Sequence, residues 1–194
     1  MIKNILQFSH QLLADAVQVG ETVIDATCGN GNDTIFLSNL VGDSGTVLAF
    51  DIQKQAIDST KRRLIDEARQ NVKLIHDGHE RVTTYLLKEQ KHGIAGAIFN
   101  LGYLPRSDKT IITKSESTLQ AIQQILDYLK TNGVVVIVIY YGHEGGLEEK
   151  ENVITFVKQL DQSAYHVLRY EFINQKNNPP FVVAIQKRKE KLNK

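Results

Sequence analysis

The sequence of 194 residues is poor in cysteine and proline, and it has no long hydrophobic run. Its single thiol, Cys28, excludes a disulfide framework and a zinc cluster built on cysteines, which favours a reducing, cytoplasmic compartment. The longest apolar run, 134–141, is too short to span a bilayer, and the first ten residues contain no signal-peptide core. We therefore expect a protein that is neither secreted nor inserted in a membrane.

An excess of charge of one sign is also missing, because 23 Lys and Arg residues face 22 Asp and Glu residues, giving a net charge of +1. This balance gives no global electrostatic reason to expect nucleic-acid binding, although a local basic patch stays open. The length predicts a single domain, which we place at 1–190, followed by a flexible tail at 191–194.

Short β-rich runs alternate with longer helical patterns along the chain. The expected strands are 22–27, 46–51, 72–76, 94–100, 134–141, 166–173 and 181–187. The expected helices are 8–19, 33–40, 53–69, 78–88, 113–129 and 147–160, and Thr131-Asn132-Gly133 is expected to stop the fifth of them. Several strand runs are apolar at nearly every residue, which is typical of strands covered by helices on both faces.

This alternation predicts an α/β fold with a seven-stranded, mostly parallel, doubly wound sheet. Parallel neighbours need a crossover connection, and the helical patterns supply it. Only residues 174–180 separate the last two strands, which is too little for a crossover helix. Those two strands are therefore expected to form an antiparallel hairpin at the end of the sheet.

The most informative segment is DATCGNGNDT, residues 25–34, directly after the first strand. Ligands of doubly wound sheets bind at the carboxyl ends of the strands, where glycines let backbone N–H groups approach them. The dinucleotide pattern would need glycine at position 34, but the sequence has Thr34 there, and the Walker pattern is absent too. Asp25 and Asp33 would repel a phosphate and attract the sulfonium and ammonium groups of S-adenosylmethionine.

Two further acids close the next two strands. Asp51 follows the second strand, where a carboxylate can accept both hydroxyls of a ribose. Asp77 follows the third strand, near the expected adenine edge, where it can accept from the exocyclic amine. Each acid alone could be a helix cap, and the glycines alone could be a tight turn. Their joint order favours a site for a cationic adenosine ligand.

On these motifs the sequence resembles the class I S-adenosylmethionine-dependent methyltransferases, which have a Rossmann-like fold. DATCGNGNDT is similar to the glycine loop of that superfamily, although its usual third glycine is replaced around Asp33. Asp51 and Asp77 are similar to its ribose and adenine acids. More narrowly, SHQLLADAV, DATCGNGNDT, HDGHE, NLGYLP and NNPPF resemble a small bacterial family of rRNA methylases. Members of that family are similar to the enzyme that methylates the aminomethyl group on the wobble uridine of tRNA.

The resemblance implies S-adenosylmethionine as cofactor. The cofactor site is expected to comprise Asp25, Thr27, Cys28, Gly29, Asn30, Gly31, Asn32, Asp33, Thr34, Asp51, Ile52, Gln53, Asp77, Gly78, His79 and Asn100. No metal is required, because the sulfonium is already activated and catalysis rests on in-line positioning and exclusion of water. Cys28 is disfavoured as a nucleophile, since its place in the glycine loop is beneath the cofactor.

The loop Asn100-Leu101-Gly102-Tyr103-Leu104-Pro105 follows the fourth strand and is similar in position to the Asn-Pro-Pro-Tyr loop of amino-methyltransferases. The resemblance implies two catalytic residues, Asn100 to orient the amine and Tyr103 to stack on the base or shape the pocket. Leu101-Gly102 replaces the paired prolines. The substrate site is expected to comprise Tyr103, Pro105, Arg106, Lys109, Tyr141 and His143. The sequence does not choose a general base among His79, His143 and a pocket lined by carbonyl groups.

The expected partner is a tRNA substrate. The alternatives are an rRNA or small-molecule methyltransferase, an NAD(P)-dependent oxidoreductase, which Asp33 and Thr34 disfavour, and a degenerate domain that only binds. A lone catalytic domain with little net charge needs a local patch or a second subunit to hold RNA, so a homodimer is a further hypothesis. For the basic clusters at 61–63 and 187–189, a solvated surface is favoured over RNA contact.

Overall fold

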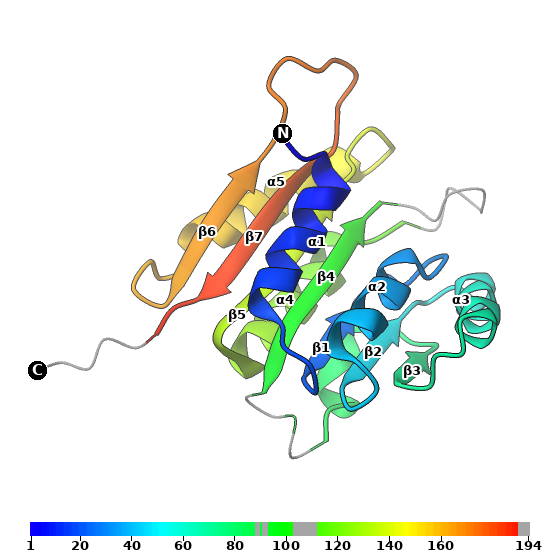
Figure 1. Ribbon diagram of the computed structural model, residues 1–194. Helices are drawn as coiled ribbons and strands as arrows, with labels where there is room; N and C mark the ends of the chain where they lie inside the picture. The colour runs from blue at the N-terminus through cyan, green and yellow to red at the C-terminus, as the bar shows by residue number, and fades with distance from the viewer. Residues whose placement is uncertain (88–89, 91–92, 103–111, 190–194) are drawn as a thin grey trace, which may run out of the picture.

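The computed structural model describes residues 1–87, 90, 93–102 and 112–189. Figure 1 shows helices and strands alternating along most of the chain. In chain order the elements are α1 (Ile5–Ala16), β1 (Thr22–Asp25), α2 (Asn32–Val41), β2 (Thr46–Phe50), α3 (Lys54–Asp66), β3 (Val72–Ile75), the 3-10 helix η1 (His79–Thr84), β4 (Ile94–Leu101), α4 (Ser115–Tyr128), β5 (Leu129–Ile139), α5 (Gly146–Gln159), β6 (Tyr165–Tyr170) and β7 (Phe181–Lys187).

The strands form one seven-stranded sheet in the order β3-β2-β1-β4-β5-β7-β6. The first five are parallel, whereas β7 pairs antiparallel with both β5 and β6. The predicted fold class and the antiparallel hairpin are therefore confirmed. Because β1 to β5 point the same way, their carboxyl ends share one edge of the sheet. All the segments predicted to hold the cofactor follow strands at this edge.

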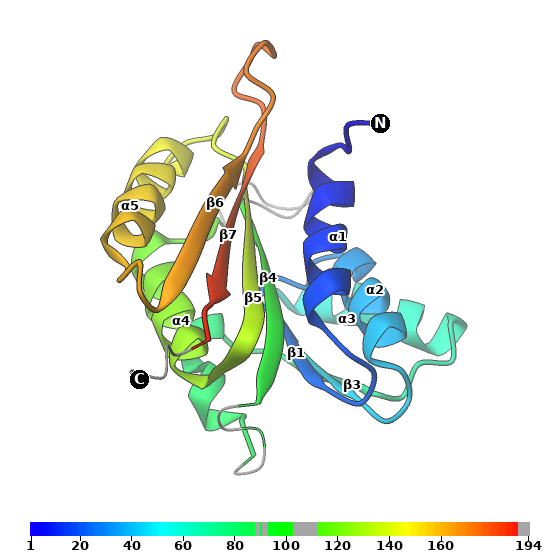
Figure 2. The same ribbon diagram turned by 60° about the vertical axis from the view of Figure 1, so that its left-hand side comes forward.

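Two helical layers cover the sheet, with α1, α2 and α3 on one face and α4, α5 and η1 on the other (Figure 2). Successive strand residues alternate between the two cores. Val23 packs with Leu13 and Leu37 under the first layer, and Ile24 packs with Phe99 and Ile122 under the second. Burial of both strand faces explains why the strand runs are apolar at nearly every residue.

The first helix begins earlier than its apolar pattern predicted, at Ile5 rather than at residue 8. Asn4 and Gln7 form a capping box, in which the Asn4 side chain accepts from the Gln7 amide at 2.9 Å and the Gln7 side chain accepts from the Asn4 amide at 3.2 Å. Reciprocal caps of this kind satisfy amides that the first turn leaves unpaired. The cap adds a turn to α1 at the end that reaches the carboxyl edge.

Two sequence predictions of local structure are wrong. The helix expected over 78–88 is the short 3-10 helix η1, and residues 88 and 89 lie outside the described part. The stop signal at 131–133 does not separate α4 from its strand, because β5 already begins at Leu129. Instead, Asn132 has a φ of +64°, and the pairing with β4 shifts register between Leu129 and Val134. Asn-Gly therefore lies in an irregular stretch of the strand, where its pairing with β4 is interrupted.

Within the described ranges, no helix is long and apolar enough to cross a membrane. The single domain over 1–190 stays a prediction, and the tail at 191–194 lies outside the described residues.

Candidate active site at the carboxyl edge

The glycine loop between β1 and α2 turns sharply at the carboxyl edge. The Gly31 amide donates to the Cys28 carbonyl at 2.7 Å, and the Cys28 amide donates to the Phe50 carbonyl at 2.8 Å. Gly29 and Gly31 have φ values of +51° and +80°, a region that favours glycine. A Cβ on Gly31 would also lie 3.0 Å from Thr60 Oγ1. Both the turn and the close approach of α3 therefore require glycine at position 31.

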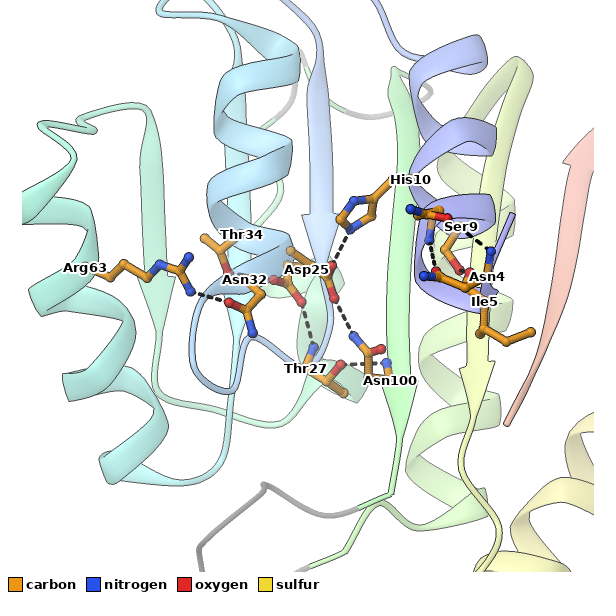
Figure 3. A network of polar contacts seen from close by, with 12 residues as sticks. Asn4, Ile5, Ser9, His10, Asp25, Thr27, Asn32, Thr34, Arg63 and Asn100 are labelled. Carbon is orange, nitrogen blue, oxygen red and sulfur yellow. Dashed lines mark hydrogen bonds and ion pairs between the residues drawn. The ribbon is translucent and has the colours of Figure 1, made fainter. Parts of the chain in front are cut away.

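Side chains of α3 hold this loop from the other side. The Thr60 hydroxyl donates to the Gly29 carbonyl at 2.9 Å, and Ser59 donates to the Asn30 side chain at 3.3 Å. Arg63 donates to the Asn32 side chain (Figure 3), and it also donates to the Asn30 carbonyl at 3.4 Å. The second half of the predicted cofactor loop is thus fixed by α3 rather than left free.

Asp51 lies at the end of β2 and links two loops. Its carboxylate accepts from the Gly29 amide at 3.0 Å and from the Gln53 amide at 2.9 Å. Burial raises the pKa of Asp51, while these two hydrogen bonds act in the opposite direction. The next residue, Ile52, is 57% exposed at the same edge. A ribose needs a hydrogen-bond acceptor for its hydroxyls, and an adenine face packs on an apolar surface. Asp51 and Ile52 offer these two features side by side.

Asp77 follows β3 and accepts from the Tyr85 hydroxyl at 2.6 Å and from the Gly78 amide at 2.9 Å. The Tyr85 hydrogen bond is the main reason that the pKa of Asp77 is lowered, and Arg81 contributes as well. His79 is buried. Its ring lies edge to face with Phe99, and its Nδ1 donates to the Ala26 carbonyl at 2.9 Å. Burial lowers the pKa of His79, which favours the neutral imidazole.

Asp25 is fully buried beneath the glycine loop. One carboxylate oxygen accepts from the Thr27 amide at 3.2 Å, and the other accepts from the Thr34 hydroxyl at 2.6 Å. Burial, together with the nearby charge of Asp33, raises the pKa of Asp25 to about 7. Its contacts stabilise the two ends of the loop. A direct contact of Asp25 with the cofactor stays a prediction.

Cys28 is likewise buried under the loop. Burial raises the pKa of its thiol, and the charges of Asp25 and Asp51 raise it further. A thiol that holds its proton is a poor nucleophile. Its location agrees with the expectation that Cys28 does not attack the substrate.

Asn100, at the carboxyl end of β4, meets residues from two other elements. Its backbone amide donates to Thr27 Oγ1 at 2.8 Å, and its side-chain amide donates to Asp33 Oδ2 at 2.7 Å. The other carboxylate oxygen of Asp33 accepts from His10 Nε2 at 2.6 Å. Figure 3 shows His10 and Asn100 approaching the carboxylate between them from opposite sides. Sequence reasoning did not assign His10 to the site, although the motif SHQLLADAV contains it, because no local spacing relates α1 to the glycine loop.

The two described ends of the loop after β4 bond to each other, and a buried carboxylate supports one of them. The Gly102 amide donates to Thr113 Oγ1 at 2.9 Å, and the Thr113 amide donates to the Gly102 carbonyl at 3.0 Å. Glu149 of α5, which is 3% exposed, accepts from the hydroxyls of Thr113 at 2.6 Å and Thr118 at 2.8 Å. Sequence reasoning also missed Glu149, whose position on α5 suggests only an ordinary helix residue.

Only two of the predicted substrate residues belong to the described part of the chain. The Tyr141 ring has Lys150 Nζ at 4.4 Å from its centroid, and His143 Nδ1 donates to the Glu144 carbonyl at 2.9 Å. Tyr103, Pro105, Arg106 and Lys109 lie outside the described residues, so their predicted positions stay predictions.

A groove of about 530 Å³ runs along α1. It is lined by Met1, Ile2, Lys3, Gln7, His10, Gln11, Ala14 and Phe36. None of these lining residues is acidic, and Lys3 is basic. One of the lining residues, His10, also contacts Asp33 at 2.6 Å, so the groove reaches the contact between Asp33 and Asn100 through that side chain. Across the described residues, no group of acidic, histidine and cysteine side chains is suited to hold a metal ion.

Comparisons with known proteins point to the same chemistry. A family model described as "Putative rRNA methylase" matches residues 47–186, and one for protein-L-isoaspartate(D-aspartate) O-methyltransferase matches residues 4–85. The chain is 36% identical to a tRNA (mnm(5)s(2)U34)-methyltransferase, chloroplastic, from Arabidopsis thaliana. That alignment covers 95% of this chain and 70% of the relative.

Two solved structures are similar over almost their whole length. One is described as a "putative rRNA-methylase" from Clostridium thermocellum, with 46% identity, a TM-score of 0.92, and coverage of 96% of this chain and 99% of that one. The other is a "putative methyltransferase" from Streptococcus mutans in complex with SAH, with 44% identity, a TM-score of 0.88 and the same coverage. The chain belongs to the "Putative rRNA methylase" family and is an S-adenosylmethionine-dependent methyltransferase that acts on RNA.

Proposed function

We propose that the protein methylates the exocyclic amine of a 5-aminomethyl wobble uridine in tRNA, forming 5-methylaminomethyl-uridine. The observation that carries the proposal is the Asn100 side chain at the carboxyl end of β4, whose amide nitrogen is bound to Asp33 at 2.7 Å. Its oxygen is thereby turned away from that carboxylate and can accept an N–H from an amine. The Arabidopsis relative, named for this wobble nucleoside, supports the same substrate.

The residues at the carboxyl edge fit S-adenosylmethionine. Each Asp51 oxygen accepts one backbone amide and keeps lone pairs for the two ribose hydroxyls. The exposed Ile52 side chain offers an apolar surface to the adenine, and Asp77 can accept from its amine. Asp33 places negative charge at the first turn of α2, where a cationic ligand is favoured over a phosphate. We assign the cofactor to this set of residues and to the glycine loop.

When bound, S-adenosylmethionine supplies a methyl group on a sulfonium, from which the substrate nitrogen displaces a neutral thioether. Asn100 holds the amine so that its lone pair points at the methyl carbon, which is the positioning effect that most of the catalysis requires. A primary alkylammonium must first lose a proton to become nucleophilic. His79 is buried beneath the glycine loop and bound to the Ala26 carbonyl, so we place it outside this proton transfer.

The RNA is expected to approach beside Asn100. The groove along α1 supports this direction, because Lys3 lines it and can contact a phosphate, and the side-chain nitrogen of Gln7 can contact a base edge. Tyr141 and His143 follow β5 at the same edge, and we retain the prediction that they contact the substrate. A homodimer stays a prediction, and light scattering at working concentration that shows only monomer would count against it.

The proposal is tested with purified protein and radiolabelled S-adenosylmethionine in four reactions. Three contain tRNA that carries 5-aminomethyl-uridine, tRNA without modifications, or rRNA, and the fourth contains no RNA. We expect label only in the first sample, as 5-methylaminomethyl-uridine in nucleoside mass spectrometry. The name of the family model favours rRNA as a second candidate substrate. Label confined to rRNA would replace tRNA with that substrate, and label in neither RNA would overturn the proposal.

A further inference from the structure

One carboxylate in the active site has no ordinary structural explanation. Asp33 lies in the first turn of α2, where an acidic residue usually interacts with the free amides of the helix. Here both oxygens instead meet side chains of other elements, His10 of α1 at 2.6 Å and Asn100 of β4 at 2.7 Å. The Asp33 side chain is only 12% exposed. The contacts therefore connect three segments that are far apart in the sequence.

The chemistry of this contact determines how Asn100 is turned. An ionised carboxylate only accepts hydrogen bonds, whereas a primary amide donates from its nitrogen and accepts at its oxygen. The Asn100 amide must therefore direct its nitrogen at Asp33 and its oxygen the other way. The backbone of Asn100 is fixed as well, since its amide donates to Thr27 Oγ1 at 2.8 Å. Rotation of the amide is thus the main freedom that Asp33 removes.

We propose that Asp33, held by His10, is a positioning residue that sets the rotation of the Asn100 amide so that its oxygen faces the substrate amine. This inference rests on the proposed function of Asn100. An amide turned the opposite way would present its N–H groups to the amine, and the nitrogen lone pair of the amine would accept a hydrogen bond from them. The lone pair that must attack the methyl carbon would then be directed at Asn100 instead.

His10 is the residue that holds the Asp33 carboxylate in place. Its ring stacks on Phe36 with centroids 3.8 Å apart and planes within 3°. The stack fixes the ring, and the Nε2–H donation then fixes the Asp33 carboxylate. His10→Phe removes the Nε2–H donor and keeps an aromatic ring to stack on Phe36. This substitution should loosen the Asp33 carboxylate without altering the packing of α1 on α2.

The decisive experiment exchanges the two polar groups. Asp33→Asn lets an amide donate to the Asn100 oxygen, and Asn100→Asp places two carboxylates together, so each single variant should lower kcat by about 100-fold. The double variant, Asp33→Asn with Asn100→Asp, restores one donor facing one acceptor and leaves a carboxylate oxygen for the amine. We expect its kcat to recover at least tenfold over either single variant.

His10→Phe should lower kcat by about tenfold, an intermediate loss because Asp33 itself remains. His166→Phe on β6, an exposed histidine far from the site, is the matched control and should leave kcat unchanged. The charge of Asp33 is assigned to attraction of the sulfonium, which SAH lacks, so the SAH affinity of every variant, measured by calorimetry, should stay within about threefold of wild type. Thermal unfolding checks that each variant is folded, and the His10→Phe comparison stands if a variant at position 33 or 100 does not fold.

The positioning proposal is overturned by wild-type kcat in Asp33→Asn, by a double variant no faster than the single variants, or by a loss confined to SAH binding. The last result would make Asp33 a direct ligand of SAH and not a positioning residue for Asn100. The methylated nucleoside formed by the wild-type enzyme is identified in the same assay. A product other than 5-methylaminomethyl-uridine therefore contradicts the proposed function, while the pattern of variants reports on Asp33 separately.

Discussion

The carboxyl edge of the sheet has a cofactor half, formed by the segments after β1, β2 and β3, and a substrate half, formed by those after β4 and β5. In the cofactor half, main-chain amides are bound directly by carboxylates, as at Asp51 with Gly29 and Gln53. In the substrate half, the described ends of the loop are joined by a main-chain bond between Thr113 and Gly102 and by the Thr113 hydroxyl, which also donates to the buried Glu149 carboxylate. The first half should therefore tolerate little change without loss of cofactor, and the second should control turnover and RNA binding.

The sharpest separation of the two halves comes from Asn100→Ala. The substitution removes the acceptor for the amine and leaves the contacts of Asp51 and Asp77 intact, so kcat should fall by about 100-fold or more. SAH affinity should change little. Stopped-time methylation assays and calorimetry check the two quantities separately. An unchanged kcat would refute the assigned role of Asn100.

The reverse pattern is expected for Asp51→Ala. Loss of the ribose acceptor should cost about 1–3 kcal/mol of binding free energy, which raises the Kd of SAH roughly 5- to 150-fold. At saturating cofactor, kcat should stay close to that of the wild type. Asp58→Ala, which removes a partly exposed carboxylate of α3, is the matched control. Equal effects of the two variants on calorimetric Kd would remove Asp51 from the cofactor site.

Glu149→Gln tests whether the substrate half depends on its buried carboxylate. Thr113 and Thr118 donate to different oxygens of Glu149, and glutamine replaces one of these oxygens with an NH2 group, so one buried hydroxyl loses its acceptor at a cost of about 1 kcal/mol. We expect a lower free energy of unfolding in urea and a several-fold higher KM for RNA, with SAH affinity preserved. Glu148→Gln, one residue earlier and exposed, should do neither. A change in SAH affinity with no change in the KM for RNA would show that Glu149 supports the cofactor half and not the substrate half.

The smallest expected effect concerns the charge under the glycine loop. Because the pKa of Asp25 is raised to about 7, the carboxyl is neutral below that pH and charged above it. The added charge attracts the sulfonium of S-adenosylmethionine more than the neutral thioether of SAH. The affinity ratio of the two ligands should therefore rise a few-fold from about pH 6 to pH 8, a Coulomb energy of the order of 1 kcal/mol. Asp25→Asn should abolish that rise, and the same slope in both proteins would contradict it.

The sequence predicted the features that local patterns determine. Strands buried on both faces appear as apolar runs, and the positions of Asp51 and Asp77 follow from the strand ends alone. The capping box at Asn4 and Gln7 was also visible in the sequence but lay outside the apolar pattern used to place α1. The predicted helix after Gly78 was wrong because a helical pattern does not distinguish six residues of 3-10 helix from a longer α-helix.

The contacts that the sequence could not reveal are tertiary. His10 meets Asp33 only because α1 and α2 pack on the same face of the sheet, and Glu149 meets Thr113 only because α5 lies next to the start of α4. Neither pair has a spacing that a single sequence marks. The burial that raises the pKa of Asp25 is equally a product of the fold.

The most direct test of the account is a crystal structure of the protein with SAH. We predict that the ribose hydroxyls lie within hydrogen-bond distance of the Asp51 carboxylate, with the sulfur facing the Asn100 oxygen. SAH bound in the groove along α1, or absent from the edge formed by Asp51, Asp77 and the glycine loop, would contradict it.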